Sequence, residues 1–140
     1  VTGVQTCALP IYSDRDIYGN PDLAPNPGLP ELWACLCDRG CRIAVVSTTR
    51  CASLVRALNN FGMLTYVDAI VGREMVSRMK PDPEPYLRAL EILGADAADA
   101  VAFDDSPSGV ASARAAGVYT ICYRGDSAAD AQLMDFRDLL

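Results

Sequence analysis

The sequence contains no histidine, and this absence removes whole classes of active site. Serine or cysteine nucleophiles that depend on a histidine base are excluded within this chain, and so is any zinc site with a histidine ligand. Catalysis by these 140 residues must therefore use carboxylates, lysine, hydroxyls or thiols.

Long apolar runs and an excess of positive charge are also missing. No apolar stretch approaches the ~20 residues that a helix needs to cross a bilayer, and the N-terminus lacks the basic start of a signal peptide. Lys and Arg number 12 against 18 Asp and Glu, a formal net charge of -6, which argues against a nucleic-acid surface or an anionic-membrane anchor. We expect a cytoplasmic monomer that binds neither nucleic acid nor membrane. A small anionic substrate remains compatible with this charge, because a bound cation can reverse the sign locally.

Paired C-x-x-C spacing is absent from the six cysteines, and we interpret them as reduced thiols. Cys35, Cys37 and Cys41 form a C-x-C-x-x-x-C cluster, but Cys35 and Cys37 should point to different faces of a helix. Small apolar filler is therefore a better interpretation of this cluster than a metal site.

Apolar residues alternate along the chain between helical spacing and short β-rich runs, which predicts alternating helices and strands. The expected helices are 29–39, 54–61, 86–93, 107–116 and a last one in the acidic tail, and the expected strands are 43–46, 67–71, 100–103 and 118–123. This order predicts an α/β fold, a Rossmann-like three-layer α/β/α arrangement with a parallel sheet. Ligands of such sheets bind at the carboxyl ends of the strands.

Two adjacent carboxylates, Asp104 and Asp105, directly follow the apolar strand Val-Ala-Phe. Such a pair repels itself unless a cation compensates, and Mg²⁺ prefers hard oxygen ligands of this kind. The alternative is that Asp105 or Ser106 merely caps the helix that Pro107 begins.

A lysine and a hydroxyl belong to the same edge of the predicted sheet. Lys80 precedes Pro81, so a stiff K-P-D-P loop can aim its ammonium; the alternative is a solvated lysine beside a helix start capped by Asp82. Ser47 ends its strand, where it could hold a phosphate oxygen or serve only as an N-cap. Positive charge, donors and carboxylates thus collect as phosphoryl transfer requires.

Taken in order, Ser47 after its strand, Lys80 in K-P-D-P-E-P-Y and Asp104 in D-D-S-P-S-G resemble three consecutive motifs of the haloacid-dehalogenase-like superfamily. The flanking segments P-G-L-P-E-L-W, L-R-A-L-E-I-L-G and G-V-A-S-A-R-A-A-G are similar to the branch that contains phosphoglycolate phosphatases, sugar phosphatases and β-phosphoglucomutases. The resemblance covers roughly Pro25 to Tyr123.

This resemblance implies a Mg²⁺-dependent phosphatase that acts on a small phosphorylated metabolite through an aspartyl-phosphate. By position, Ser47 and Thr48 would bind the phosphoryl group, Lys80 would stabilise its charge, and Asp105, helped by Asp104, would hold Mg²⁺. The family's nucleophile and acid/base are two aspartates of a D-x-D-G-T segment that ends the first, central strand, ahead of a helical cap. That segment and most of the cap are absent, so the chain is expected to lack the central strand and to be an inactive fragment.

The beginning of the chain does not match the family. Residues 1–11, V-T-G-V-Q-T-C-A-L-P-I, look like translated adapter sequence rather than natural protein. We expect 12–25 to be a remnant of the cap and linker, and 26–140 to be the catalytic core.

A rival interpretation makes Asp14 and Asp16 a degenerate nucleophile motif of a capless enzyme, because an apolar run precedes them. Pro10 would then interrupt a central strand, where proline is disfavoured. Ile17 would also replace the glycine expected after the second aspartate.

Two further functions stay open. The chain could be a natural phosphate-binding module that lost its nucleophile, or part of a β-phosphoglucomutase-like phosphomutase. A phosphoacceptor receiver domain is excluded by order, because such domains place their acid pair first and their lysine last.

Overall fold

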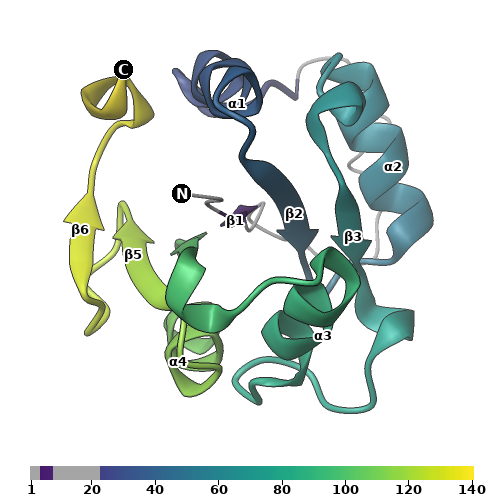
Figure 1. Cartoon of the computed structure of the whole chain (residues 1–140), viewed down its shortest axis with the longest axis vertical. Helices are drawn as coiled ribbons and strands as arrows, with labels where there is room; N and C mark the ends of the chain where they lie inside the picture. Colours follow the sequence, from purple (N-terminus) through teal and green to yellow (C-terminus); the bar gives the residue numbers. More distant parts are fainter. Residues whose placement is uncertain (1–3, 8–22) are drawn as a thin grey trace.

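The computed structural model describes residues 4–7 and 23–140, which form one parallel sheet with helices on both faces (Figure 1). The strands are β1 (Val4–Cys7), β2 (Arg42–Val46), β3 (Ala69–Val71), β4 (Ala100–Asp104), β5 (Tyr119–Tyr123) and β6 (Ala131–Leu133), in the order β3-β2-β1-β4-β5-β6. The helices are α1 (Leu29–Asp38), α2 (Cys51–Asn60), α3 (Glu84–Leu93) and α4 (Pro107–Ala115). Every neighbouring pair of strands is parallel, so the predicted α/β class is confirmed.

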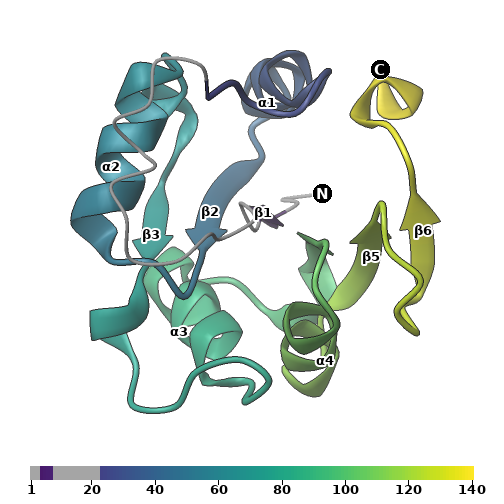
Figure 2. The ribbon, with the colours of Figure 1, turned by 180° about the vertical axis from the view of Figure 1, so that it is seen from behind.

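Helices cover both faces of the sheet, which makes the three layers that the alternating pattern predicts. One face is covered by α1 and α2 and the other by α3 and α4, as the two opposite views show (Figures 1 and 2). Along β2, Ile43 and Val45 belong to the core under α1 and α2, whereas Ala44 and Val46 belong to the core under α3. Successive side chains of a strand point to opposite faces, so β2 is buried on both.

One helix end is fixed by a residue close in the sequence, and another helix start is fixed by a residue far along the chain. Gly94 ends α3 with a φ of 58°, the left-handed conformation that favours glycine at this position. By contrast, α2 begins at Cys51, ahead of the predicted start at Leu54. The Cys51 N–H donates to Glu74 Oε1 at 2.9 Å, and this partner from far along the chain satisfies a donor that a helix start leaves unpaired.

The centre of the sheet differs from expectation. β1 lies between β2 and β4 and pairs with both, Thr6 standing level with Ala44 and Ala102. The expectation that the central strand is missing is therefore corrected. The physical reason is that an empty position would leave the facing edges of β2 and β4 with unpaired backbone groups. Whether residues 1–11 are natural, and whether the boundaries at 12–25 and 26–140 hold, stay predictions.

The acidic tail forms no α-helix, so the prediction of a last regular helix there was wrong. It forms β6 and a short 3₁₀ turn, Phe136–Leu139. Asp130 starts the pairing, since its N–H donates to Thr120 O at 2.9 Å and its Oδ2 accepts from Thr120 N at 2.8 Å. Phe136 is buried and stacks on Tyr123 with ring centroids 4.3 Å apart, which draws the end of the chain onto the sheet.

Helices long and apolar enough to cross a membrane are not found among the described residues.

Candidate active site

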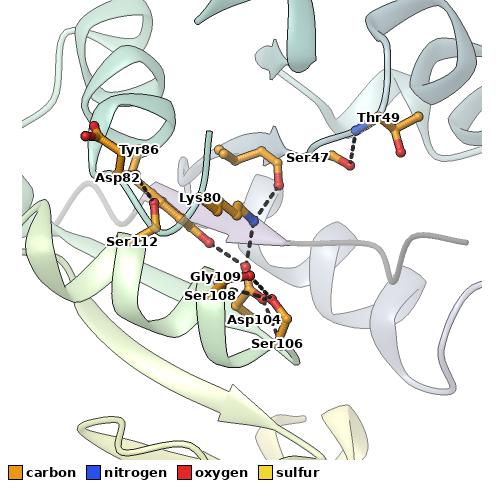
Figure 3. Close-up of polar contacts among 11 residues, drawn as sticks. Ser47, Thr49, Lys80, Asp82, Tyr86, Asp104, Ser106, Ser108, Gly109 and Ser112 are labelled. Atoms are coloured by element: carbon orange, nitrogen blue, oxygen red, sulfur yellow. Dashed lines mark hydrogen bonds and ion pairs between the residues drawn. The ribbon is translucent and has the colours of Figure 1, made fainter. Parts of the chain in front are cut away.

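The candidate site lies at the carboxyl ends of the central strands, where Lys80 joins β2 to β4. Lys80 comes from the loop between β3 and α3, and its Nζ donates to Val46 O at 3.1 Å and to Asp104 Oδ2 at 2.7 Å (Figure 3). β1, between these strands, ends at Cys7, level with Phe103. The predicted lysine and the first of the two predicted carboxylates therefore meet at one edge of the sheet.

Asp104 is a buried carboxylate whose hydrogen-bonding capacity is filled. Its Oδ1 accepts from the N–H and the Oγ of Ser106 at 3.0 and 2.8 Å, and its Oδ2 accepts from Lys80 Nζ and the Tyr86 hydroxyl, both at 2.7 Å. A carboxylate offers about four acceptor positions, and all are used. Burial opposes the charge, but the Lys80 ammonium with these hydrogen bonds outweighs it and holds the pKa of Asp104 below its ordinary value.

The start of α4 is built around this carboxylate. Ser106 caps α4, its Oγ accepting from Gly109 N at 3.0 Å while it donates to Asp104. A Cβ on Gly109 would lie 2.0 Å from the Asp104 carboxyl atoms, so only glycine allows the helix this close. The capping alternative is thus correct for Ser106, which also supports the acid.

Lys80 is not a solvated surface lysine, because only 5% of its side chain is exposed. Its Nζ lies 5.0 Å from the centroid of the Tyr86 ring. Val46 O and Asp104 engage two of the three N–H groups of an ammonium, and no further acceptor for Nζ is found in residues 23–140. Asp82 Oδ1 accepts from Glu84 N, at the first residue of α3, at 2.9 Å, although the N-cap position itself is Pro83.

Ser47 and Thr48 follow Val46, whose carbonyl Lys80 contacts. Ser47 is buried, its N–H donates to Val71 O at 3.0 Å, and its Oγ accepts from Thr49 N at 3.2 Å. Thr48 is half-buried. The Ser47 hydroxyl therefore holds the turn that follows β2, but it does not cap α2, whose N-cap is Arg50. The N-cap alternative for Ser47 is thus wrong, and its phosphate-binding role stays a prediction.

Asp105 differs from its neighbour. It is half-buried, and burial together with the negative charge of Asp104 raises the pKa of its carboxyl. No other residue in the described part of the chain donates a hydrogen bond to this carboxylate.

The two aspartates differ in their capacity to bind a divalent cation. Asp104 has no acceptor position left, whereas Asp105 offers a hard oxygen ligand of the type that Mg²⁺ binds together with water and phosphate oxygens. Residues 4–7 and 23–140 contain no group of three acidic, cysteine or histidine ligands that could enclose a metal. From these residues, one carboxylate would hold the cation directly.

The sequence reasoning missed two buried polar residues of the site. Tyr86, in the first turn of α3, contacts Asp104 as described. Ser112 of α4 is buried, and its Oγ donates to Asp82 O at 2.5 Å, which fixes the loop that carries Lys80 (Figure 3). A hydroxyl on the apolar face of a helix was the available signal in both cases. The nucleophile candidates of the rival interpretation, Asp14 and Asp16, lie outside the described residues.

Comparison with known proteins shows that this chain is similar to a family of hydrolases and to several of their relatives. The family description "Haloacid dehalogenase-like hydrolase" matches residues 9–123. Protein CbbY of Rhodobacter capsulatus is 38% identical over 86% of this chain and 57% of its own length. A plasmid-encoded phosphoglycolate phosphatase of Cupriavidus necator is 39% identical over 66% of this chain and 40% of its own length. The phosphorylated carbohydrates phosphatase of Thermotoga maritima is 33% identical over 71% of this chain and 46% of its own length.

Solved structures show the same likeness. A CbbY variant from Rhodobacter sphaeroides, in complex with xylulose-(1,5)bisphosphate, superposes with a TM-score of 0.81 at 30% identity, over 88% of this chain and 59% of that one. A hydrolase from Geobacter sulfurreducens superposes with a TM-score of 0.75 at 27% identity, over 81% of this chain and 53% of that one. The chain spans about half the length of the relatives it matches.

Proposed function

Because the chain belongs to the haloacid dehalogenase-like hydrolase family, we propose that it is the core of a Mg²⁺-dependent phosphatase acting on a small phosphorylated metabolite. One observation carries the proposal: the buried Lys80–Asp104 pair at the ends of β2 and β4. A buried ion pair is costly to form, and here it leaves an ammonium N–H at the edge where α/β sheets bind ligands.

The residues of this edge suit a phosphoryl group. Lys80 would stabilise the charge that develops on the transferring group, and Ser47 with Thr48 would donate hydrogen bonds to its oxygens. Asp104 holds the Lys80 ammonium in place through the ion pair. Asp105 would hold Mg²⁺, and this cation supplies charge neutralisation for the phosphate oxygens when bound.

The nucleophile is the missing part. We propose that an aspartate forms the aspartyl-phosphate and that it belongs to a D-x-D-G-T segment outside the described residues. Asp104 cannot take this role, because Lys80, Tyr86 and Ser106 occupy its oxygens. The 140-residue chain is accordingly expected to be inactive.

The substrate class follows from the relatives by analogy. Phosphoglycolate and phosphorylated carbohydrates are named for the relatives from Cupriavidus necator and Thermotoga maritima, and xylulose-(1,5)bisphosphate is bound by the CbbY neighbour. These names support a sugar phosphate or phosphoglycolate as the substrate of this protein, and the cytoplasmic location stays a prediction.

The test compares the 140-residue chain with a longer form in which residues 1–11 are replaced by a central strand that ends in a D-x-D-G-T segment and is followed by a complete cap. Only the longer form should hydrolyse an aryl phosphate in Mg²⁺, and Lys80→Met should abolish this activity. Phosphate binding without turnover by the longer form would instead support a binding module. Turnover by the 140-residue chain that Asp14→Asn abolishes would support the capless enzyme, and turnover that survives both Asp14→Asn and Asp16→Asn would refute the mechanism.

A further inference from the structure

Tyr86 contacts both members of the buried ion pair. Its side chain is fully buried under the sheet, and its hydroxyl donates to Asp104 Oδ2 at 2.7 Å, the same oxygen that accepts from Lys80 Nζ at 2.7 Å. The Tyr86 ring also lies 5.0 Å from Nζ. Figure 3 shows the phenol reaching the carboxylate from the α3 side.

This arrangement restricts where the Lys80 ammonium can point. Val46 O and the ring of Tyr86 limit the position of the ammonium on two sides. The Tyr86 hydroxyl fills the second acceptor position of Asp104 Oδ2. Without the hydroxyl, that lone pair would be buried and unsatisfied, which is costly. The ammonium would move to fill it, because Lys80 has the nearest mobile donors. Its remaining N–H would then turn away from the edge of the sheet.

We propose that Tyr86 is a positioning residue that sets the direction of the Lys80 ammonium through Asp104. The aim of that ammonium at a phosphoryl group rests on the proposed function, whereas the effect of Tyr86 on Lys80 does not. The loop itself is held separately by Ser112, whose Oγ donates to Asp82 O. Loop placement and ammonium direction are therefore controlled by different helices.

The experiment uses the fact that Lys80 is the only lysine in the sequence. Protein made with lysine labelled at the ζ nitrogen with ¹⁵N gives a single side-chain ammonium signal, so NMR reports on Lys80 alone. In Tyr86→Phe, which keeps the ring, we expect this signal to shift and its hydrogen exchange to quicken by about tenfold, the effect of one hydrogen bond. Inorganic phosphate, titrated in Mg²⁺ buffer, should bind about tenfold more weakly.

Two controls separate positioning from stability. Tyr119→Phe removes a hydroxyl from a side chain that is 51% exposed, and Leu93→Ala destabilises the same core without touching the pair; both should keep the wild-type ammonium signal. A folded Tyr86→Phe with the wild-type signal and exchange rate would overturn the proposal. A changed signal supports it even if the wild-type chain binds no phosphate, a result that would count against the proposed function alone.

Discussion

At the scale of single residues, two adjacent aspartates have opposite surroundings. Asp104 is saturated by donors from the start of α4, from α3 and from the Lys80 loop, whereas Asp105 receives none from another described residue. The pKa of Asp104 is lowered and that of Asp105 is raised. The motif predicted that both carboxylates would lie at the strand end. It could not predict which of them would be buried against Lys80, because Lys80 and Tyr86 lie far away in the sequence.

This asymmetry predicts different effects on stability. Asp104→Asn leaves the Lys80 ammonium buried without its counter-charge, and breaking a buried pair in this way should cost about 3 kcal/mol of unfolding free energy. Asp105→Asn removes a carboxylate that is partly buried and repelled by Asp104, so stability should be unchanged or slightly higher. Urea unfolding followed by the fluorescence of Trp33, the one tryptophan, measures both. Equal losses would contradict the unequal roles assigned to the two acids.

At the scale of elements, apolar periodicity was enough for the helices and strands between Leu29 and Tyr123, where each segment buries a face or a stripe. It failed for the tail. β6 has three residues, too short to show a period, and its pairing depends on Asp130 contacting Thr120 of another strand. Tyr86 and Ser112 escaped notice for a related reason, since the acceptors of both hydroxyls belong to other elements.

The tail should contribute stability through one aromatic side chain. Phe136 is 1% exposed and packs on Tyr123 and Phe103, so Phe136→Ala should reduce the unfolding free energy by about 3 kcal/mol or more. Met134 is 64% exposed and makes a matched control, because Met134→Ala removes little buried surface. Thermal unfolding by circular dichroism compares the two. Similar melting temperatures for both variants would show that the tail is not part of the cooperative core.

At the scale of the whole molecule, the sheet depends on its first strand. The sequence pattern predicted a parallel three-layer fold, and the family resemblance indicated that the first strand is central. Neither predicted that Val4–Cys7 would be that strand. A strand of four residues is too short to show a clear apolar period. Their place is decided by the edges of β2 and β4, which are far apart in the sequence and adjacent in the sheet.

The role of β1 can be tested with one substitution. Thr6→Pro removes a backbone N–H from a strand that is paired on both sides, a position where proline is not tolerated, and it should lower the unfolding free energy by about 2 kcal/mol or more. Thr6→Val keeps the N–H and the β-branched shape and should have little effect. Urea unfolding distinguishes the two variants. Indifference to both would show that residues 4–7 are not needed at the centre of the sheet.

The position of β1 also governs the order in which the molecule can assemble. Val4 pairs with Arg42 and with Ala100, so the two halves of the sheet are joined through a strand that precedes both halves in the chain. Closing such distant pairs is slow, because chain entropy is lost before contacts are gained. On the ribosome, β2 and β3 can form early, but the sheet cannot close until β4 has emerged. Until then an open strand edge is exposed to other nascent chains, and this interval is where aggregation should compete with folding.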